Sequence, residues 1–316
     1  MRETCMKILT KKNILICGAA LCVLLIIIGI ASGEKKQVNI WYVEQGLENE
    51  WARILREAKP PDVFSQTRVW DGGEIPSGAG ILIATRPWQS EENPVVFPRL
   101  SWELEHNGAI VLALDPWMVF RKHNNPPLTI NRLTEAGGNG LLLIPGRDIA
   151  AVRAWTSRFI QEAPGKFPTD KRIWQEWEFK LFDGNRFPMG ARGYDWQTVL
   201  FRLMGNEPAW LYAPLSTIRH YRDPHKSILE ATPFPESGGQ NSLQAKILWA
   251  LPTGSEKNKE KIAATIAWLK KPDTQTIIAD MLEWIPADPY GVPYDPVSLS
   301  SHRIWLTAAW VYTINE

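Results

Sequence analysis

The sequence predicts an α/β protein in which mainly parallel sheets are flanked by helices, after an N-terminal helix that spans a membrane or directs export. Three observations predict this class. Short apolar runs alternate with amphipathic helical patterns, which is typical of parallel strands joined by helices. The length of 316 residues allows one large domain or two ordinary ones. Hydrophobic residues make up 45% and charged residues 22% of the chain, so a packed core is expected.

The N-terminal segment is first basic and then apolar. Residues 14–31 carry no charge, and this run exceeds the roughly 7–15 apolar residues of a signal peptide and approaches the roughly 20 that span a bilayer. We expect residues 1–33 to be a retained signal anchor, with a cytoplasmic N-terminus and an exported body. A cleaved export signal is the alternative, because Ala31, Ser32 and Gly33 have the small side chains that a signal peptidase needs. Lipidation at Cys22 is not expected, because this cysteine lies inside the apolar run.

The composition excludes several classes of function. The formal net charge is +1, so charge gives no case for binding nucleic acid. Basic and acidic residues nearly balance outside residues 1–33, which favours an uncharged ligand. The three cysteines, Cys5, Cys17 and Cys22, all precede the exported body. That body therefore has no disulfide framework, no thiolate metal site and no cysteine nucleophile.

The first part of the body alternates between predicted strands and helices. Alternating β-branched and aromatic residues predict strands, whereas an apolar stripe with a period near 3.6 predicts a helix. The predicted elements are a strand over 38–43, a helix over 46–58, a strand over 63–70, a strand over 81–84, a helix near 98–105 and a strand over 109–114. The wholly apolar strand over 81–84 is typical of a buried parallel strand.

Residues 246–289 contain the clearest succession of elements. A strand over 247–251 ends at Pro252, and an amphipathic helix runs from 258 to Pro272. Pro272 opens a second helix, which runs to about 282, and Asp273 is favourable near the positive end of that helix. Residues 283–287 then form a loop. Earlier in the chain we expect a strand over 140–145 and a helix over 148–162.

These C-terminal residues resemble a known family. The matching residues are Ser255, Lys257, Asn258, Lys259, Glu260, Ala263, Ala264, Trp268, Leu269, Lys271, Pro272, Asp273, Gln275, Trp284, Ile285, Pro286 and Ala287. They resemble the C-terminal part of the extracellular solute-binding proteins that serve ABC importers, especially the sugar-binding group. Shorter patches near the first strand and near 205–211 resemble the same family. A helix that family members carry after the position of Gly137 is missing.

The resemblance implies a two-lobed fold of the periplasmic-binding-protein type. Lobe 1 is expected to comprise residues 34–112 and 248–290, and lobe 2 residues 113–247 and 291–316. Family members bind a small molecule between the lobes and deliver it to the permease subunits of an ABC importer. For this chain the resemblance implies a saccharide, no cofactor, and a place at the periplasmic face of the cytoplasmic membrane, where residues 14–31 would hold it.

Polar residues that follow the predicted strands are the first candidates for ligand binding, because ligands of open α/β sheets meet the loops beyond the strand C-termini. Tryptophans in predicted loops add flat faces that pack against the apolar side of a sugar ring. The resemblance adds the loop expected over 212–216 and the loop over 283–287. The candidate ligand-binding residues are Glu44, Gln45, Asp71, Arg86, Trp88, Asp115, Trp117, Tyr212, Glu283 and Trp284. Trp51, Trp155 and Trp268 have helical spacings and are expected in the core.

The sequence lacks the motifs of common catalytic sites. It contains no G-x-S-x-G elbow, no Walker phosphate loop and no H-E-x-x-H helix. His220 and His225, separated by Pro224, lack the spacing of metal ligands on one helix face. We therefore expect a binding protein that performs no bond chemistry. Two alternatives stay open: a membrane-anchored module of this fold that has lost its ligand and contacts a protein partner, and an exported glycosidase, which would need two carboxylates roughly 5–10 Å apart.

Overall fold

The computed structural model describes residues 39–61, 64–76, 80–85, 96–98, 109–134, 141–161, 166–183, 186–220, 228–236, 242–253 and 259–312. Apart from Asn39, every described residue belongs to one compact unit, Ile40–Glu316. Within these residues no helix is long and apolar enough to cross a membrane. Residues 14–31 lie outside them, so the expected anchor stays a prediction.

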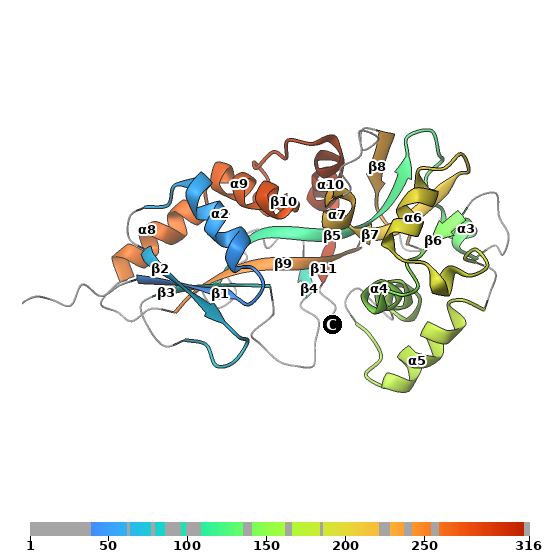
Figure 1. Ribbon diagram of the computed structural model, residues 1–316, viewed down its shortest axis with the longest axis horizontal. Coiled ribbons are helices and arrows are strands. Elements are labelled where there is room, and N and C mark those ends of the chain that lie inside the picture. Colours follow the sequence, from blue (N-terminus) through green and yellow to red (C-terminus); the bar gives the residue numbers. More distant parts are fainter. Residues whose placement is uncertain are drawn as a thin grey trace, which may run out of the picture. The chain divides into compact units, whose positions relative to one another are not determined.

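The main strands are hydrogen-bonded in the order β2-β1-β3-β9-β5-β7-β6. Their bounds are β1 (Asn39–Glu44), β2 (Phe64–Trp70), β3 (Gly80–Ala84), β5 (Ile110–Lys122), β6 (Leu141–Leu143), β7 (Ala209–Pro214) and β9 (Ser242–Pro252). Four shorter strands lie off this path: β4 (Val96–Pro98), β8 (Leu229–Thr232), β10 (Ile285–Pro286) and β11 (Trp310–Tyr312). Figure 1 shows the two long strands, β5 and β9, side by side. Most predicted strands are thus confirmed, with bounds that shift by a few residues.

The expectation of mainly parallel pairing is wrong. β1 with β3, β6 with β7 and β9 with β11 are parallel. β9, however, is antiparallel to both β3 and β5, and β5 is antiparallel to β7, β8 and β10. Alternation of strands and helices predicts parallel pairs between strands that are near in sequence. It does not reveal that β9, from late in the chain, enters the sheet between β3 and β5 in the opposite direction.

β5 pairs with β9 along its first half and with β7 along its second half. Its residues from Ile110 to Pro116 pair with β9, and from Trp117 onward it pairs with β7. The prediction of a strand that ends at 114 and a loop that begins at Asp115 is therefore wrong. Proline is tolerated at an unpaired strand edge. The pairing of β5 with β10 ends at Leu114, and its pairing with β7 begins at Trp117. Pro116 lies between these two stretches.

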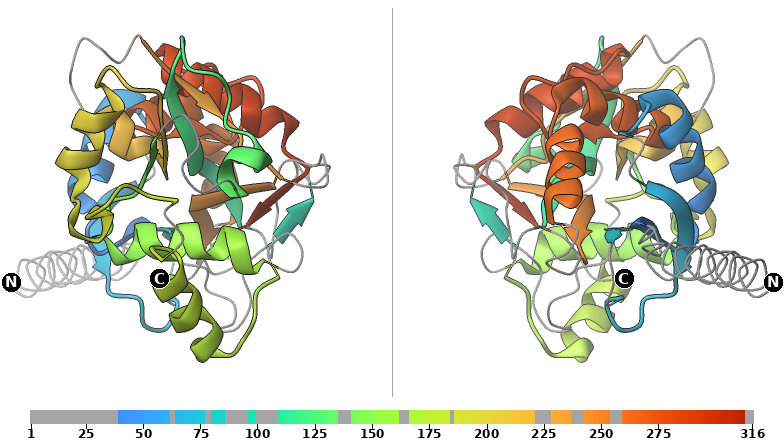
Figure 2. Two further views of the ribbon diagram at one scale, coloured as in Figure 1. Left: turned by 90° about the vertical axis from the view of Figure 1, so that its right-hand side faces the viewer. Right: turned by 90° about the vertical axis from the view of Figure 1, so that its left-hand side faces the viewer.

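The described helices are α2 (Glu48–Ala58), α3 (Ile130–Thr134), α4 (Ile149–Ile160), α5 (Lys171–Lys180), α6 (Trp196–Leu203), α7 (Leu215–His220), α8 (Lys259–Leu269), α9 (Pro272–Leu282) and α10 (Pro296–Thr307). The helices predicted over 46–58, over 148–162 and from 258 to about 282 are confirmed, whereas α3, α5, α6, α7 and α10 were not predicted from the sequence. Asp148 caps α4 by accepting a hydrogen bond from the backbone of Ala151, and Pro272 occupies the first turn of α9. Figure 2 shows α4 and α5, in light green, next to one another. The helix predicted near 98–105 lies outside the described residues.

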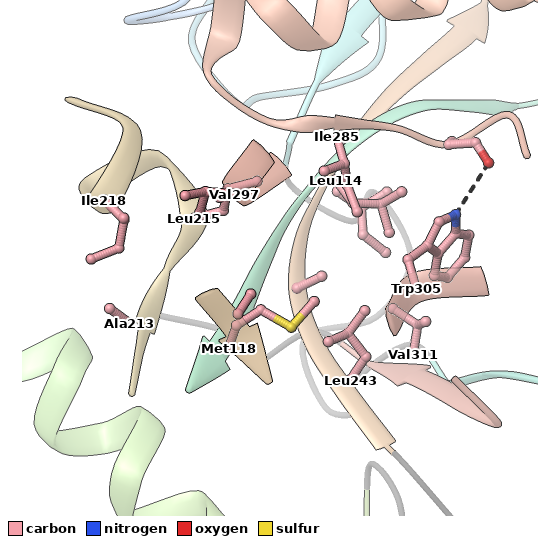
Figure 3. Close-up of a cluster of buried hydrophobic side chains, with 14 of the residues drawn as sticks. Leu114, Met118, Ala213, Leu215, Ile218, Leu243, Ile285, Val297, Trp305 and Val311 are labelled. Atoms are coloured by element: carbon pink, nitrogen blue, oxygen red, sulfur yellow. Dashed lines mark hydrogen bonds between the residues drawn. The ribbon is translucent and has the colours of Figure 1, made fainter. Parts of the chain in front are cut away.

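Three clusters of buried side chains form the core. The α10 cluster includes Leu114, Met118, Leu243, Val297 and Trp305, and Figure 3 shows it with the indole of Trp305 donating to the carbonyl of Ala287 at 3.4 Å. The α9 cluster includes Trp41, Trp51, Ala113, Leu248 and Trp268. The α4 cluster includes Val119, Trp155, Phe187, Tyr212 and Phe234. Trp51, Trp155 and Trp268 are each at most 7% exposed, so their prediction as core residues is confirmed.

Candidate functional site

One face of β5 and β9 is apolar along the whole pairing. Because successive side chains of a strand point to opposite faces, Leu114 and Met118 of β5 share a face with Leu243, Ala245 and Ile247 of β9. All five belong to the α10 cluster, which α10 and β11 complete. This side of the two strands is fully used for packing.

The opposite face is apolar at its two ends and polar between them. Ala113 and Leu248 are paired and belong to the α9 cluster. Val119, farther along β5 on the same face, belongs to the α4 cluster. Asp115 and Lys246 stand opposite one another between these two clusters. A charged pair thus interrupts the apolar face at the place where β5 passes from β9 to β7.

Solvent reaches these two strands at the same place. Every residue of β5 is buried except Trp117, which is half-buried, and Lys122 at the strand end. Every residue of β9 is buried except Lys246, which is exposed, and Pro252 at the strand end. Trp117 and Lys246 are diagonal neighbours on one face, and side chains of this length reach one another across about 7–8 Å. We call the group formed by Asp115, Trp117, Gln244 and Lys246 the polar window.

Asp115 is held by Ser216, the second residue of α7. Its two carboxylate oxygens accept hydrogen bonds from the backbone nitrogen of Ser216 at 2.9 Å and from the Ser216 hydroxyl at 2.6 Å. Burial raises the pKa of the Asp115 carboxyl to about 6, although these hydrogen bonds and the charge of Lys246 act to lower it. The carboxylate therefore fixes α7 against β5 and presents little of itself to solvent, being 6% exposed.

Trp117 has a firm support on one side. Its ring packs on that of Tyr212, with the ring centroids 5.4 Å apart. The Tyr212 hydroxyl donates to Oε1 of Gln244 at 3.1 Å. Burial raises the pKa of Tyr212 well above its ordinary value, so this hydroxyl stays protonated. The half-buried indole is thereby fixed from behind while part of it stays accessible.

Arg158 of α4 lies at the centre of a buried network beneath Tyr212. Its Nε donates to the Tyr212 hydroxyl at 2.8 Å, and its Nη1 donates to Glu236 at 2.9 Å and to the Ser242 hydroxyl at 3.0 Å. The guanidinium carbon also lies 4.9 Å from the ring centroid of Phe234. A buried cation requires such partners. The network ties α4 to β7 and to the start of β9, and so fixes the support of Trp117.

Arg219 of α7 joins three other segments. Its Nη2 donates to Asp280 of α9 at 2.6 Å, and its Nη1 donates to the carbonyl of Trp284 at 3.2 Å. Its Nε lies 3.1 Å from a carboxylate oxygen of Asp295, the residue that caps α10. α7 is therefore anchored at two points. Ser216 connects it to β5, and Arg219 connects it to α9 and α10.

A second polar group lies where β1, β2 and β3 end. Glu44 accepts hydrogen bonds from the backbone nitrogen of Thr85 at 2.5 Å and from its hydroxyl at 2.7 Å. The backbone nitrogen of Gln45 donates to the carbonyl of Trp70 at 2.9 Å, next to Asp71. Glu44, Gln45 and Asp71 thus lie at neighbouring strand ends, and their predicted role in ligand binding stays a prediction. Glu44 is buried, whereas Gln45 and Asp71 are exposed.

The other predicted site residues have different surroundings. Asp115, Trp117 and Tyr212 were expected in loops, and all three lie within strands because β5 and β7 pair with each other beyond the predicted ends. Trp284, also expected in a loop, is 6% exposed and packs in the α9 cluster. Glu283 ends α9 in a left-handed conformation with φ of 61°.

Arg86 and Trp88 lie outside the described residues, and the eight described candidates do not form one group.

Sequence reasoning missed Lys246, Gln244 and Arg158. A signal for the first two exists, because Gln244 and Lys246 alternate with apolar residues in the stretch 242–252 and therefore share a strand face. Arg158 has no such signal, since its partners come from distant segments. Among the described residues no group of three or more His, Cys, Asp or Glu could hold a metal ion. His225 and the side chain of His220 are outside that search.

Comparison with known proteins gives matches in structure alone. No family model matches the sequence, and no curated protein matches it. A probable secreted solute-binding lipoprotein from Streptomyces coelicolor is similar with a TM-score of 0.60 and 12% identity over 90% of both chains. The apo form of RafE from Streptococcus pneumoniae has a TM-score of 0.57 and 10% identity over 89% of both chains. The bacterial solute receptor AcbH, with a TM-score of 0.56 and 12% identity, matches over 87% of both chains.

Because the sequence identities are only 10–12%, the comparisons establish a shared fold and nothing beyond it. The chain has the two-lobed α/β fold of periplasmic binding proteins, as expected from its resemblance to them, and the match extends over nearly the whole chain.

Proposed function

We propose that this chain is an extracytoplasmic binding protein for a saccharide, which it delivers to an ABC import permease. The polar window carries the proposal. The two long strands open to solvent at Trp117 and Lys246, where an aromatic ring with a fixed back stands beside polar side chains. A partly exposed indole packs on the apolar face of a sugar ring, while neighbouring polar groups bond to its hydroxyls.

Proteins of the same fold support the ligand class. RafE is known in complex with raffinose, and AcbH has an exclusive preference for β-D-galactopyranose. A Bordetella ferric binding protein shares the fold with a TM-score of 0.52, so the fold by itself does not decide the ligand. The choice of a saccharide therefore rests on the aromatic and polar character of the window.

The arrangement in the cell follows from the same proposal. Residues 34–112 with 248–290 form one lobe and residues 113–247 with 291–316 the other, and ligand binding draws the lobes together. Residues 14–31 hold the body at the outer face of the cytoplasmic membrane. The intact mass of the native protein tests this arrangement, since a chain that starts at Glu34 would rule out the anchor.

A thermal-shift screen tests the function. Mono- and oligosaccharides, amino acids and polyamines are added to the full-length protein in detergent. A ligand at 100 times its Kd stabilises by about 2.7 kcal/mol, which raises the Tm of a chain of this size by roughly 4 °C. We expect such a shift with a saccharide and its loss in Trp117→Ala. Trp196→Ala, at another half-buried indole, is the control and should keep the ligand-induced shift.

One observation favours the second candidate, a module that binds a protein instead of a small molecule. Tyr290, Val292 and Tyr294 are 81%, 59% and 77% exposed, and the intervening Gly291 and Pro293 are buried. Tyrosine is enriched at protein interfaces, so these three exposed side chains, close together in the sequence, form a candidate contact surface. This candidate replaces the first under two conditions. No small molecule shifts the Tm, and substitution of Tyr290, Val292 and Tyr294 by serine removes the chain from a membrane complex.

The glycosidase alternative gains no support from the buried carboxylates. An acid and its partner must face one space to act on a glycosidic bond. Glu44 is committed to the backbone and hydroxyl of Thr85, and Asp115 to those of Ser216. Both carboxylates thus hold backbone segments in place.

A further inference from the structure

We infer that the ligand of the polar window carries an anionic group, a carboxylate or a phosphate on a sugar, and that Lys246 is the residue that selects it. The inference rests on the proposed function and specifies its ligand. It starts from the position of Lys246, which is the one exposed residue inside β9 and stands among buried neighbours on both sides.

The ammonium group of Lys246 is available to a ligand. The carboxylate opposite it in the register is Asp115, whose oxygens both accept hydrogen bonds from Ser216. Within the described part of the chain the ammonium group of Lys246 forms no ion pair and no hydrogen bond, while Asp115 acts on it at longer range. An exposed lysine with three unused donors is a point charge that suits carboxylate and phosphate groups.

Within the described strands β5 and β9, Asp115 is the one acid beside Lys246 in the register. Gln244, on the same face of β9, is neutral and engaged by Tyr212. Asp280 and Asp295 lie near α7 but are paired with Arg219.

The adjacent indole decides between an anionic sugar and a simple anion. Trp117 offers its accessible side on the same face, diagonal to Lys246. A small inorganic anion would contact Lys246 alone, whereas a sugar acid spans both side chains. We therefore expect recognition to require the ring and the charge together, which differs from the uncharged ligand that the near-neutral composition favours.

The test compares matched ligands on the full-length protein in detergent. Galacturonate, glucuronate and galactose 6-phosphate are titrated against galactose and glucose by calorimetry, with inorganic phosphate and acetate as bare anions. We expect at least one anionic sugar to bind tenfold or more tightly than its neutral parent, and the bare anions to bind weakly. Comparison of the affinities for the two uronates and for galactose 6-phosphate shows whether a carboxylate or a phosphate is preferred.

Variants then assign the preference to Lys246. Lys246→Met should reduce the tenfold ratio to about one while the affinity for the neutral sugar changes less than twofold, and Lys246→Arg should keep the ratio. Lys261→Met, at an exposed lysine of α8, is the control and should change neither. Raising the salt concentration should lower the ratio in the unchanged protein, since exposed charges are screened.

Three outcomes overturn the inference. Equal affinity for neutral and anionic sugars contradicts it and leaves the proposed function intact. A preference that survives in Lys246→Met moves the selection to another residue. Binding of no sugar at all, neutral or anionic, overturns both the inference and the proposed function.

Discussion

The two faces of β5 and β9 have different roles, although alternate residues of the same strands form them. On one face Leu114, Met118 and their partners pack without interruption against α10. On the other face the packing stops at Asp115 and Lys246 and resumes at Val119. Packing is therefore continuous on one face, whereas the other face admits solvent between two packed clusters. Neighbours in sequence, such as Leu114 and Asp115, should respond to substitution in different ways.

The largest loss of stability is expected beneath the interrupted face, at Arg158. Arg158→Met removes a buried cation with three side-chain partners and leaves Glu236 without its ion pair. Breaking a buried pair in this way costs about 4 kcal/mol. Urea unfolding measures the change. Arg172→Met, at an exposed guanidinium paired with Asp170, is the matched control and should unfold at the same urea concentration as the unchanged protein.

The next effect is expected on the packed face. Leu114→Ala removes a side chain that is 1% exposed in the α10 cluster and should lower the free energy of unfolding by about 3 kcal/mol. Saccharide affinity should stay unchanged, because the side chain points away from the polar window. Ile149→Ala, at a side chain that is 72% exposed, should cost little. A large loss of affinity in Leu114→Ala would contradict the separation of the two faces.

A smaller effect, dependent on pH, is expected at Asp115. Its pKa is raised in the folded chain, to about 6, so the folded protein binds this proton more readily than the unfolded chain does. The carboxyl therefore contributes stability that is present below its ordinary pKa and is lost as pH rises through about 6. The stability of the unchanged protein relative to Asp115→Asn should fall by about 2 kcal/mol between pH 4 and pH 7. Urea unfolding at several pH values measures this difference, and a rise with pH would refute it.

The smallest effect on stability is expected at Lys246. This side chain is exposed and forms no ion pair with the described residues, so Lys246→Met should change the free energy of unfolding by less than about 0.5 kcal/mol. The same variant is expected to lose its preference for anionic sugars. A destabilisation of the size expected for Leu114→Ala would show that Lys246 belongs to the packed structure of the strand.

The sequence predicts those elements whose signal is local. The helices around residues 46–58 and 258–282 have continuous apolar stripes, and Pro272 marks the start of α9 where the structure has it. Trp51, Trp155 and Trp268 follow helical spacing into the core. In these cases the residues that decide the outcome lie within one turn or two of each other.

The misplaced elements depend on contacts between distant segments. Asp115 and Pro116 have the character of a turn, yet pairing with β9 and then β7 keeps them in a strand. Tyr212 stays in β7 for the same reason, and its hydroxyl is held by Arg158 and Gln244. Local patterns contain no information about such partners. The candidate site is accordingly predicted in part: Asp115 and Trp117 are in the polar window, whereas Lys246 and Gln244 were not recognised.

The position of β9 in the sheet has a consequence for how the chain reaches its folded state. β9 fills the place between β3 and β5 but begins only at Ser242, late in the sequence. Until β9 has been synthesised, one edge of β3 and one edge of β5 lack their hydrogen-bonding partner. Pairing between segments so far apart in the sequence is slow. During synthesis the earlier segments stay exposed to aggregation. A chain truncated before Ser242 should therefore be recovered as aggregate, because it lacks the strand that joins the two parts of the sheet.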